Sequence, residues 1–520
     1  MCDGFTSSAV LWLYIKNWYP EADLHFTIHE GKQHGLDDKI KWILTQNFNL
    51  IIVPDAGSYD KEEMEQLVEK GIDVCAVDHH EKLLEPDGSI HIYNGPGAVI
   101  INNQLSDHYP NKSLSGVGVV YKFCEALDET FNRHDAPNYL DLVALGEIAD
   151  VMFQGTDETR YLIMEGLSHI QNEGFIALIR SQKFSLKERA EPPYSLTPMD
   201  VAWYIGPLVN AIVRVGTTQE KETMFLAFID PYKNLPSTKR GAKPGDTETA
   251  CEQNARVAGN ARSKQTAIKQ RAMELLEGRA QEQGLFDNSV LVIQVEPEDN
   301  IPQEMTGLIA MDFVTKYNRP CLIGRLNDEG MLQGSIRNNE NFEAVPDLKG
   351  YLEKTGMFFY LAGHSNACGF GIDANSVPRF LEYSNAQLDL SSFQNCYIVD
   401  YILDANKYQL QKLLASLARR PDCFGNGVDE VKIVIENVPI KNPFFMGANK
   451  DSTKLTYNGI DYVRFKDLNF VADVLENKEK RLNLLITLNI NNYNGRQSIQ
   501  GFIKDYELVD APQDDDRFEF

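Results

Sequence analysis

The tripeptide Asp78-His79-His80 groups one carboxylate with two imidazoles directly after a predicted strand over residues 72–77. Carboxylate oxygens and imidazole nitrogens bind divalent cations and transfer protons. Taken alone, the tripeptide is also consistent with a polar strand end at the surface. Its interpretation therefore depends on which other side chains the fold brings beside it.

Three further aspartates are placed where they can join this tripeptide. Asp55 follows a second predicted strand, over residues 50–53. Asp3 stands at the head of the first predicted helix, and Asp150 closes a later one. Because the carboxyl ends of the strands in a doubly wound sheet meet in one crevice, we expect these side chains to converge there.

Such a cluster of carboxylates predicts bound cations, because like charges in one place repel one another. Carboxylate and imidazole without thiolate suit a hard or borderline ion such as Mn²⁺ or Mg²⁺. Two ions about 3.5–4 Å apart would offset the charge, activate a water molecule and stabilise the leaving oxygen of a phosphoester. The residue types thus favour a metal-dependent phosphodiesterase.

The segments that carry these residues alternate between short apolar runs and amphipathic stretches, which is typical of a parallel, doubly wound α/β sheet. We expect strands over 24–28, 50–53 and 72–77, and helices over 7–19, 37–46, 60–70, 117–130 and 139–149.

Residues 231–247 combine proline, glycine and charge, and predict a linker. The stretch 252–283 has almost no helix breaker and predicts a helix about 45 Å long. From Lys239 to Arg279 there are nine basic and five acidic residues, an excess of four positive charges in an acidic chain.

The second half predicts a smaller α/β unit and then a β-rich unit. Strands over 290–295 and 320–324 flank a helix over 304–317. Later strands, over 431–436, 482–490 and 499–503, predict a small β-barrel. The expected domains are 1–235, 286–385 and 395–508, with a linker and long helix over 236–285 and an acidic tail over 509–520.

Length and charge limit the classes of function. The 520 residues carry a formal charge of −25, so bulk charge cannot hold the protein on DNA or on an anionic membrane. We find no apolar run of the roughly 20 residues that span a bilayer, and no signal peptide. The eight cysteines form no CxxC pair, which favours reduced thiols in a cytoplasm.

Several segments resemble a known family in the right order over residues 1 to about 508. MCDGFTSSA, VPDAG, VDHH and LGEIADV resemble the four motifs of the DHH phosphoesterases. SGVGVVYKF and GPLVNAIVRVG resemble the RecJ-like, single-strand-specific exonucleases of that family. GSIRN and AGHSNACGFGI resemble the DHH-associated C-terminal domain, and LNINNYNGRQSIQGFIKDYEL resembles an OB-fold.

The resemblance implies metal ligands at Asp3, Asp55, His79 and Asp150, with Asp55 bridging two ions and His80 taking part in catalysis. The family's first motif reads Asp-x-Asp-Gly, with another Asp just before it, and Met1 stands where the penultimate Asp would be. We expect either that upstream residues are missing from this sequence or that the site holds one ion well and a second poorly.

Other residues are expected to contact substrate. The resemblance implies that Ser335, Arg337 and His364 hold a phosphate and face the metals, because a guanidinium grips phosphate through two hydrogen bonds. Arg214 is expected at a substrate phosphate, with a structural ion pair as the alternative. Lys32 and His34 are weaker candidates for substrate contact, and the alternative for them is a solvated loop. Tyr493 and Arg496 are also weaker candidates, and the alternative for them is a place in the core of the barrel.

The implied function is removal of nucleotides from the 5′ end of single-stranded DNA in repair and recombination. One alternative is a phosphodiesterase of oligoribonucleotides or small nucleotides. Another is a catalytically impaired DHH scaffold that binds single-stranded DNA. We expect a monomeric cytoplasmic protein without membrane contact. The tail Asp514–Phe520 resembles the tips of single-strand-binding proteins. We expect a docking peptide for a replication partner, a segment that folds back on the protein's own basic groove as a DNA mimic, or a solvated terminus.

Overall fold

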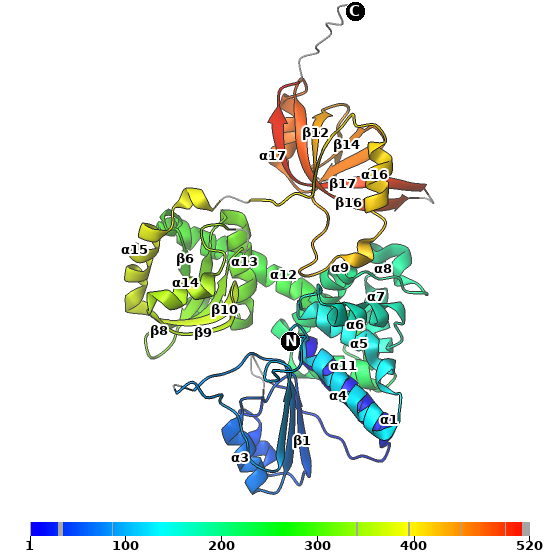
Figure 1. Ribbon diagram of the computed structural model, residues 1–520, viewed down its shortest axis with the longest axis vertical. Helices are drawn as coiled ribbons and strands as arrows, with labels where there is room; N and C mark the ends of the chain where they lie inside the picture. The colour runs from blue at the N-terminus through cyan, green and yellow to red at the C-terminus, as the bar shows by residue number, and fades with distance from the viewer. Residues whose placement is uncertain are drawn as a thin grey trace, which may run out of the picture. The chain divides into compact units, whose positions relative to one another are not determined.

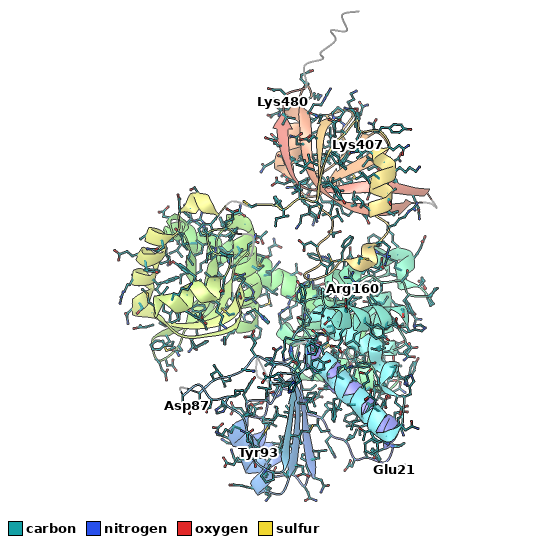
Figure 2. The ribbon with its side chains drawn as sticks, in the orientation of Figure 1. Glu21, Asp87, Tyr93, Arg160, Lys407 and Lys480 are labelled. Atoms are coloured by element: carbon teal, nitrogen blue, oxygen red, sulfur yellow. The ribbon has the colours of Figure 1, made fainter. Side chains whose placement is uncertain are left out.

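The computed structural model describes residues 2–29, 35–85, 87–339, 342–393, 396–447, 449–493 and 496–511. Contacts divide the chain into unit 1, Met1–Cys396, and unit 2, Tyr397–Phe520 (Figure 1). Figure 2 adds the side chains, with Tyr93 labelled in unit 1 and Lys407 and Lys480 labelled in unit 2. The tail residues 512–520 lie outside the described part, so the prediction of a docking peptide stays a prediction.

Unit 1 is a mixed α/β structure that begins with a parallel three-stranded sheet in the order β1-β2-β3. These strands are β1 (Leu50–Pro54), β2 (Asp73–Asp78) and β3 (Ala98–Asn102). Parallel pairing aligns Pro54 with Val77, so the carboxyl ends of β1 and β2 lie at one edge. The sheet packs on α2 (Ile40–Ile43) and α3 (Lys61–Glu69) through an apolar cluster that includes Val53, Met64 and Leu67.

A helical layer surrounds the start of the chain. Helix α1 (Cys2–Trp18) packs against α4 (Gly116–Phe131) and α5 (Leu140–Ala149), and Figure 1 shows α1 and α4 side by side. The remaining helices of this layer are α6 (Asp157–Ser168), α7 (Glu173–Ser181), α8 (Lys183–Leu186), α9 (Pro198–Asp200), α10 (Gly206–Val215) and α11 (Thr218–Ile229).

Two predicted elements differ from the structure. Residues 24–28 form no strand in the described structure, and Phe26 packs its ring against Trp12 of α1 and Phe225 of α11. The helix expected over 37–46 is reduced to the four residues of α2. In residues 24–28 the apolar pattern corresponds to contacts with helices instead of contacts with neighbouring strands.

The predicted linker contains part of a short hairpin. Within residues 231–247, β4 (Asn234–Pro236) pairs with β5 (Thr247–Thr249) in an antiparallel hairpin. Helix α12 (Ala250–Glu282) follows directly and has 33 residues, about 50 Å at 1.5 Å per residue. Thr249 starts this helix in a capping box with Glu252, a signal that the sequence TETACE carries in plain form.

The rest of unit 1 is a five-stranded sheet in the order β6-β7-β8-β10-β9. Its strands are β6 (Leu291–Gln294), β7 (Cys321–Leu326), β8 (Met331–Arg337), β9 (Phe358–His364) and β10 (Ala367–Asp373). Its helices are α13 (Thr306–Tyr317), α14 (Leu348–Thr355) and α15 (Val377–Gln387). One continuous apolar core joins this part to the helical layer.

Unit 2 is a seven-stranded sheet in the order β11-β12-β16-β17-β15-β14-β13 around its own apolar core. Its strands are β11 (Tyr401–Asp404), β12 (Ile433–Pro439), β13 (Phe444–Met446), β14 (Ser452–Tyr457), β15 (Ile460–Arg464), β16 (Arg481–Tyr493) and β17 (Arg496–Val509). Its helices are α16 (Leu410–Leu417) and α17 (Leu468–Glu476).

Two further observations concern the described residues as a whole. No described helix combines the length and the apolar character that crossing a bilayer requires. All eight cysteines are free thiols, and most of them are buried.

Candidate metal centre and phosphate site

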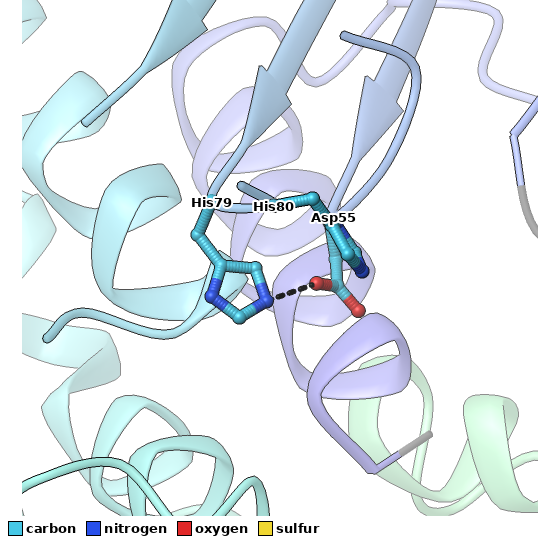
Figure 3. Close-up of side chains that lie close together, drawn as sticks. All are labelled: Asp55, His79 and His80. Atoms are coloured by element: carbon cyan, nitrogen blue, oxygen red, sulfur yellow. Dashed lines mark ion pairs between the residues drawn. The ribbon is translucent and has the colours of Figure 1, made fainter. Parts of the chain in front are cut away.

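The ends of β1 and β2 bring the first candidate residues together. Asp55 follows β1 in a left-handed backbone conformation, with φ of 60°, and its amide donates to the carbonyl of Val77. An aspartate tolerates this conformation better than a branched apolar residue would. The turn directs the Asp55 carboxylate toward His79, which follows the last residue of β2 (Figure 3).

Three carboxylates surround one imidazole nitrogen. Nε2 of His79 lies 3.2 Å from Oδ1 of Asp55, 3.7 Å from Oδ2 of Asp3 and 3.7 Å from Oδ2 of Asp150. These residues come from the end of β1, the first turn of α1 and the C-cap of α5. The structure therefore brings together the aspartates and the histidine that the sequence places far apart.

The orientation of His79 is set from its other side. Its Nδ1 lies 3.0 Å from the carbonyl oxygen of Leu114. A carbonyl only accepts hydrogen bonds, so Nδ1 carries a proton and Nε2 is the nitrogen that can bind a cation among the carboxylates. A metal-binding histidine is commonly held in this way.

Asp78 positions the histidine pair instead of joining the carboxylates around Nε2. Its Oδ1 accepts from Nδ1 of His80 at 2.6 Å and from the amide of His79 at 2.7 Å, and its Oδ2 accepts from the amide of Ser58. Burial raises the pKa of Asp78, but its hydrogen bonds and the charge of His80 outweigh burial and lower it. This role is visible only in the fold.

Asp3 is fully buried and is held by the start of α4. Its Oδ2 accepts from the amide of Gly116 at 2.6 Å, and its Oδ1 accepts from the amide of Val117 at 2.9 Å. The unpaired amides at a helix N-terminus favour a negative group. The carboxylate is therefore fixed in position before any ligand binds.

The charges of this cluster do not balance. Burial and the charges of Asp55 and Asp150 raise the pKa of Asp3 well above its usual range. Burial also raises the pKa of Asp150. For His79 burial acts to lower the pKa, but the surrounding carboxylates outweigh it and raise the value to about 10. One imidazole thus faces three carboxylates, and an added cation would remove the imbalance.

These side chains fit a divalent cation. Ligand atoms of Asp55, His79 and His80 all lie within 4.8 Å of one another, and so do those of Asp3, His79 and Asp150. Oδ1 of Asp55 is buried and has no hydrogen-bond partner, although it is at ion-pair distance from His79. A buried carboxylate oxygen without a partner is costly unless a cation or a donor meets it.

Glu147 is a buried carboxyl that sequence reasoning did not single out. Its Oε1 accepts from the amide of Ser115, its Oε2 has no partner, and its side chain is completely buried. Burial raises the pKa of Glu147 to about 8, so it is largely protonated at neutral pH. The pattern of the motif LGEIAD predicts a buried helix but gives no sign that the carboxyl group of Glu147 is buried in it.

A second site is formed by cations without acidic partners. Burial, followed by the charges of Arg337 and Arg262, lowers the pKa of Arg214. Among the described residues, Arg214 and Arg337 form no ion pair, and Arg262 only donates to the side chain of Gln265 at 2.7 Å. Guanidinium groups without an acidic partner are candidates for binding an anion, and no ion pair of Arg214 is found among the described residues.

The arginines of this site come from distant segments. Arg214 lies in the last turn of α10, Arg262 lies within α12 and Arg337 ends β8. A Cβ on Gly307 would lie 2.6 Å from Nη2 of Arg337, so this guanidinium covers the first turn of α13. Arg262 was not predicted; the only signal in the sequence was the positive excess over residues 239–279.

The other predicted substrate residues are placed as follows. Ser335 is buried in β8, with its hydroxyl 2.9 Å from that of Thr306. His364 is exposed at the end of edge strand β9. Lys32 and His34 lie outside the described residues. Tyr493 and Arg496 end β16 and begin β17, and their side chains lie outside the described part.

Comparison with protein families gives two matches. The model of the DHH family, N-terminal domain, matches residues 2–147, and that of the RecJ OB domain matches residues 399–505. The chain is 32% identical to YorK of the SPbeta prophage of Bacillus subtilis (strain 168), a putative single-strand DNA-specific exonuclease, covering 98% of this chain and 86% of YorK. The single-stranded-DNA-specific exonuclease RecJ of the same bacterium is 24% identical, covering 97% of this chain and 60% of RecJ.

Solved structures share the fold. A structure of RecJ from Thermus thermophilus in complex with Mn²⁺ superposes with a TM-score of 0.71 at 19% identity, covering 98% of this chain and 68% of that one. A structure of RecJ from the same organism with Mg²⁺ gives a TM-score of 0.63 at 17% identity, covering 98% of this chain and 66% of that one.

Proposed function

The chain belongs to the RecJ-like members of the DHH family, and from this premise we propose that it is a divalent-metal-dependent exonuclease that degrades single-stranded DNA from the 5′ end. The observation that carries the proposal is the convergence of Asp3, Asp55 and Asp150 on Nε2 of His79. The relatives' names support the substrate, and the two RecJ complexes support Mn²⁺ or Mg²⁺.

In this proposal Asp3, Asp55, His79 and Asp150 are metal ligands, with His80 contributing beside Asp55. Two cations bound there would supply an activated water and offset the charge of the phosphodiester. The hydrogen bond from His79 to Leu114 occupies Nδ1 and leaves Nε2 for this purpose. Asp78 keeps His80 in place, so the ligands need little reorganisation on binding.

The arginine site gives the proposed polarity a physical basis. Arg214, Arg262 and Arg337 provide positive charge without acidic partners, which suits a terminal phosphate more than the singly charged diester inside a strand. We propose that a 5′-phosphate binds there, with Ser335 as an additional hydrogen-bond donor and His364 contributing from β9. Degradation in repair or recombination follows from this activity as part of the same proposal.

A direct test uses the purified chain with single-stranded DNA labelled at either end. We expect nucleotides to be released from the 5′ end in Mn²⁺ or Mg²⁺ and no release in EDTA. Asp55→Asn provides the control for a contaminating nuclease. Preferential cleavage of short oligoribonucleotides would instead support a small-nucleotide phosphodiesterase. Metal-independent binding of DNA without any hydrolysis would support a non-catalytic scaffold.

A further inference from the structure

The β4–β5 hairpin presents an exposed group of cations that the proposed reaction does not use. Its connecting residues, 237–246, are here called the basic hairpin loop. Lys239, Arg240 and Lys243 in this loop are all exposed, and Asp246 is the loop's acidic residue. In a chain with a formal charge of −25, this is a local surface of opposite sign.

The loop holds its shape through its own backbone. The amide of Ser237 donates to the carbonyl of Asp246, the amide of Ala242 to that of Lys239, and the amide of Asp246 to that of Lys243. The Asp246 carboxylate accepts from the amide of Lys243 at 2.7 Å. These turns hold the cationic side chains on an ordered backbone, so a ligand need not order the loop on binding.

The hairpin is also anchored to α12. Glu248 of β5 is 3% exposed, and its Oε1 accepts from Arg256 at 2.5 Å, from Gln253 at 3.0 Å and from the amide of Thr238 at 3.0 Å. Arg256 and Gln253 both belong to α12. A buried carboxylate with several charge-assisted hydrogen bonds resists displacement, so the hairpin and the start of the helix form one rigid piece.

The same helix reaches the arginine site. Arg262 lies twelve positions after Ala250, the first residue of α12, which is about 18 Å along the helix axis. Two residues later in the same helix, Lys264 donates to the carbonyl of Val215, the residue that follows Arg214, at 2.9 Å. The basic hairpin loop is therefore held at a set distance from the place where a terminal phosphate is proposed to bind.

Two of the three cations of the loop have no acidic partner among the described residues. Lys239 forms an ion pair of 3.5 Å with Oε2 of Glu248, whose other oxygen already has four donors. Among the described residues, Arg240 and Lys243 form no ion pair. A loop that only faces solvent needs neither a hydrogen-bonded backbone nor a group of positive side chains. Both properties favour contact with a polyanion.

We propose that the basic hairpin loop binds backbone phosphates of the single strand away from the metal centre, as a second contact for the nucleic acid that the metal centre degrades. This inference rests on the proposed function. Single-stranded nucleic acid is favoured over an acidic peptide because the loop is rigidly joined to the helix that carries Arg262. Lysine and arginine contacts to phosphate carry no base preference, so the loop favours long strands over short ones regardless of sequence.

The test removes the three positive charges in the variant Lys239→Ala/Arg240→Ala/Lys243→Ala. The matched control is Lys41→Ala/Lys70→Ala/Lys354→Ala, which loses the same charge from exposed side chains of unit 1 elsewhere. Binding of a long, fluorescently labelled single strand is measured by anisotropy in EDTA over a series of salt concentrations. Because EDTA prevents turnover, this measurement is independent of whether the metal centre is catalytic.

We expect the slope of log affinity against log salt to become shallower by about 2 in the hairpin variant, since each phosphate contact on a single strand contributes about 0.7. The control should keep the original slope. In Mn²⁺, the preference for a long strand over a dinucleotide should also fall in the hairpin variant alone. If hydrolysis fails in every protein while the slope still changes, the proposed function is wrong and the hairpin contact stands.

Two results would overturn the inference. One is an unchanged slope in the hairpin variant, or an equal change of slope in the control. The equal change would show that the slope depends only on the net charge of the protein. The other is an unchanged DNA slope together with a loss of binding to labelled poly-glutamate, which would identify the loop as a site for acidic peptides. Circular dichroism on each variant shows whether the chain remains folded. If the alanine variant is unfolded, the measurement is repeated with Lys239→Gln/Arg240→Gln/Lys243→Gln.

Discussion

A Cβ atom on Gly116 would lie 2.4 Å from Oδ1 of Asp55. These residues are far apart in sequence, yet the first turn of α4 and the end of β1 meet so closely that only a hydrogen fits between them. The same turn donates its amides to Asp3. The glycine therefore has two functions: it admits one carboxylate and orients another.

This contact predicts that Gly116→Ala is more damaging than its size suggests. The added methyl must displace Asp55, so we expect metal affinity and nuclease activity to fall at least about tenfold, because ligand geometry tolerates little error. Isothermal titration calorimetry with Mn²⁺ measures the metal affinity, and release of labelled nucleotides measures the nuclease activity.

Gly259→Ala is the control for this change. Gly259 lies within α12, and nothing is within 4 Å of the position that its Cβ would take. Alanine is favoured over glycine in a helix interior by about 1 kcal/mol, so this variant should be slightly more stable and equally active. Equal Mn²⁺ affinity in the two variants would contradict the role of Gly116.

Removing a metal ligand should nearly abolish turnover. We expect Asp55→Ala to reduce the rate by roughly two to three orders of magnitude or more, because the carboxylate holds charge next to the reacting phosphate. Asp150→Ala should behave in the same way. Asp23→Ala, whose side chain is 92% exposed, is the matched control. Near-normal rates in either of the first two variants would exclude the proposed centre.

The arginine site predicts a preference at the 5′ end. Arg337→Ala should weaken the binding of a 5′-phosphorylated strand more than the binding of a 5′-hydroxyl strand. A lost charged hydrogen bond costs about 1.5–3 kcal/mol, which corresponds to a rise in KM of roughly 10- to 150-fold. Arg379→Ala, an exposed arginine of α15, should change neither strand. An equal effect of Arg337→Ala on both strands would place the terminal phosphate elsewhere.

The same site should bind anions without DNA. Inorganic phosphate is expected to raise the midpoint of thermal unfolding relative to chloride at equal ionic strength, since a ligand that binds only the folded state stabilises it. The increase should shrink in Arg214→Gln, which removes one of the three charges. The same increase in the variant would argue against an anion site at these arginines.

Glu147 predicts a pH dependence of stability. Its pKa rises from an ordinary value of 4.5 to about 8 in the folded chain, so the folded state holds a proton that the unfolded state has lost. This contribution is complete below pH 4.5 and is lost as the pH rises to about 8. In EDTA, the free energy of unfolding should therefore fall by a few kcal/mol over this window, on the order of 2–4.

Glu147→Gln should remove that decrease, because the amide cannot ionise. Urea unfolding at pH 5 and pH 8.5 measures it, and Glu222→Gln on the exposed face of α11 is the control. Parallel pH profiles for the unmodified chain and Glu147→Gln would show that this carboxyl does not carry the dependence.

Much of the site could be predicted from the sequence because its signals are local. Apolar runs with clear breakers define β1 and β2, and the residues just after them, Asp55 and His79, meet because parallel strands end at one edge. The long helix α12 was predicted for the same reason, since its cap and its uninterrupted pattern lie within the segment itself.

Only the tertiary structure decided the remaining features, because they depend on residues far apart in the chain. Residues 24–28 pack on helices instead of forming a strand. The hairpin of β4 and β5 is anchored to the following helix, because Glu248 accepts a hydrogen bond from Arg256. Arg262 joins the proposed anion site only because the fold brings α10 and β8, with Arg214 and Arg337, near α12. Periodicity predicts which face of an element is buried, but the packing of the whole chain determines which charges that burial brings together.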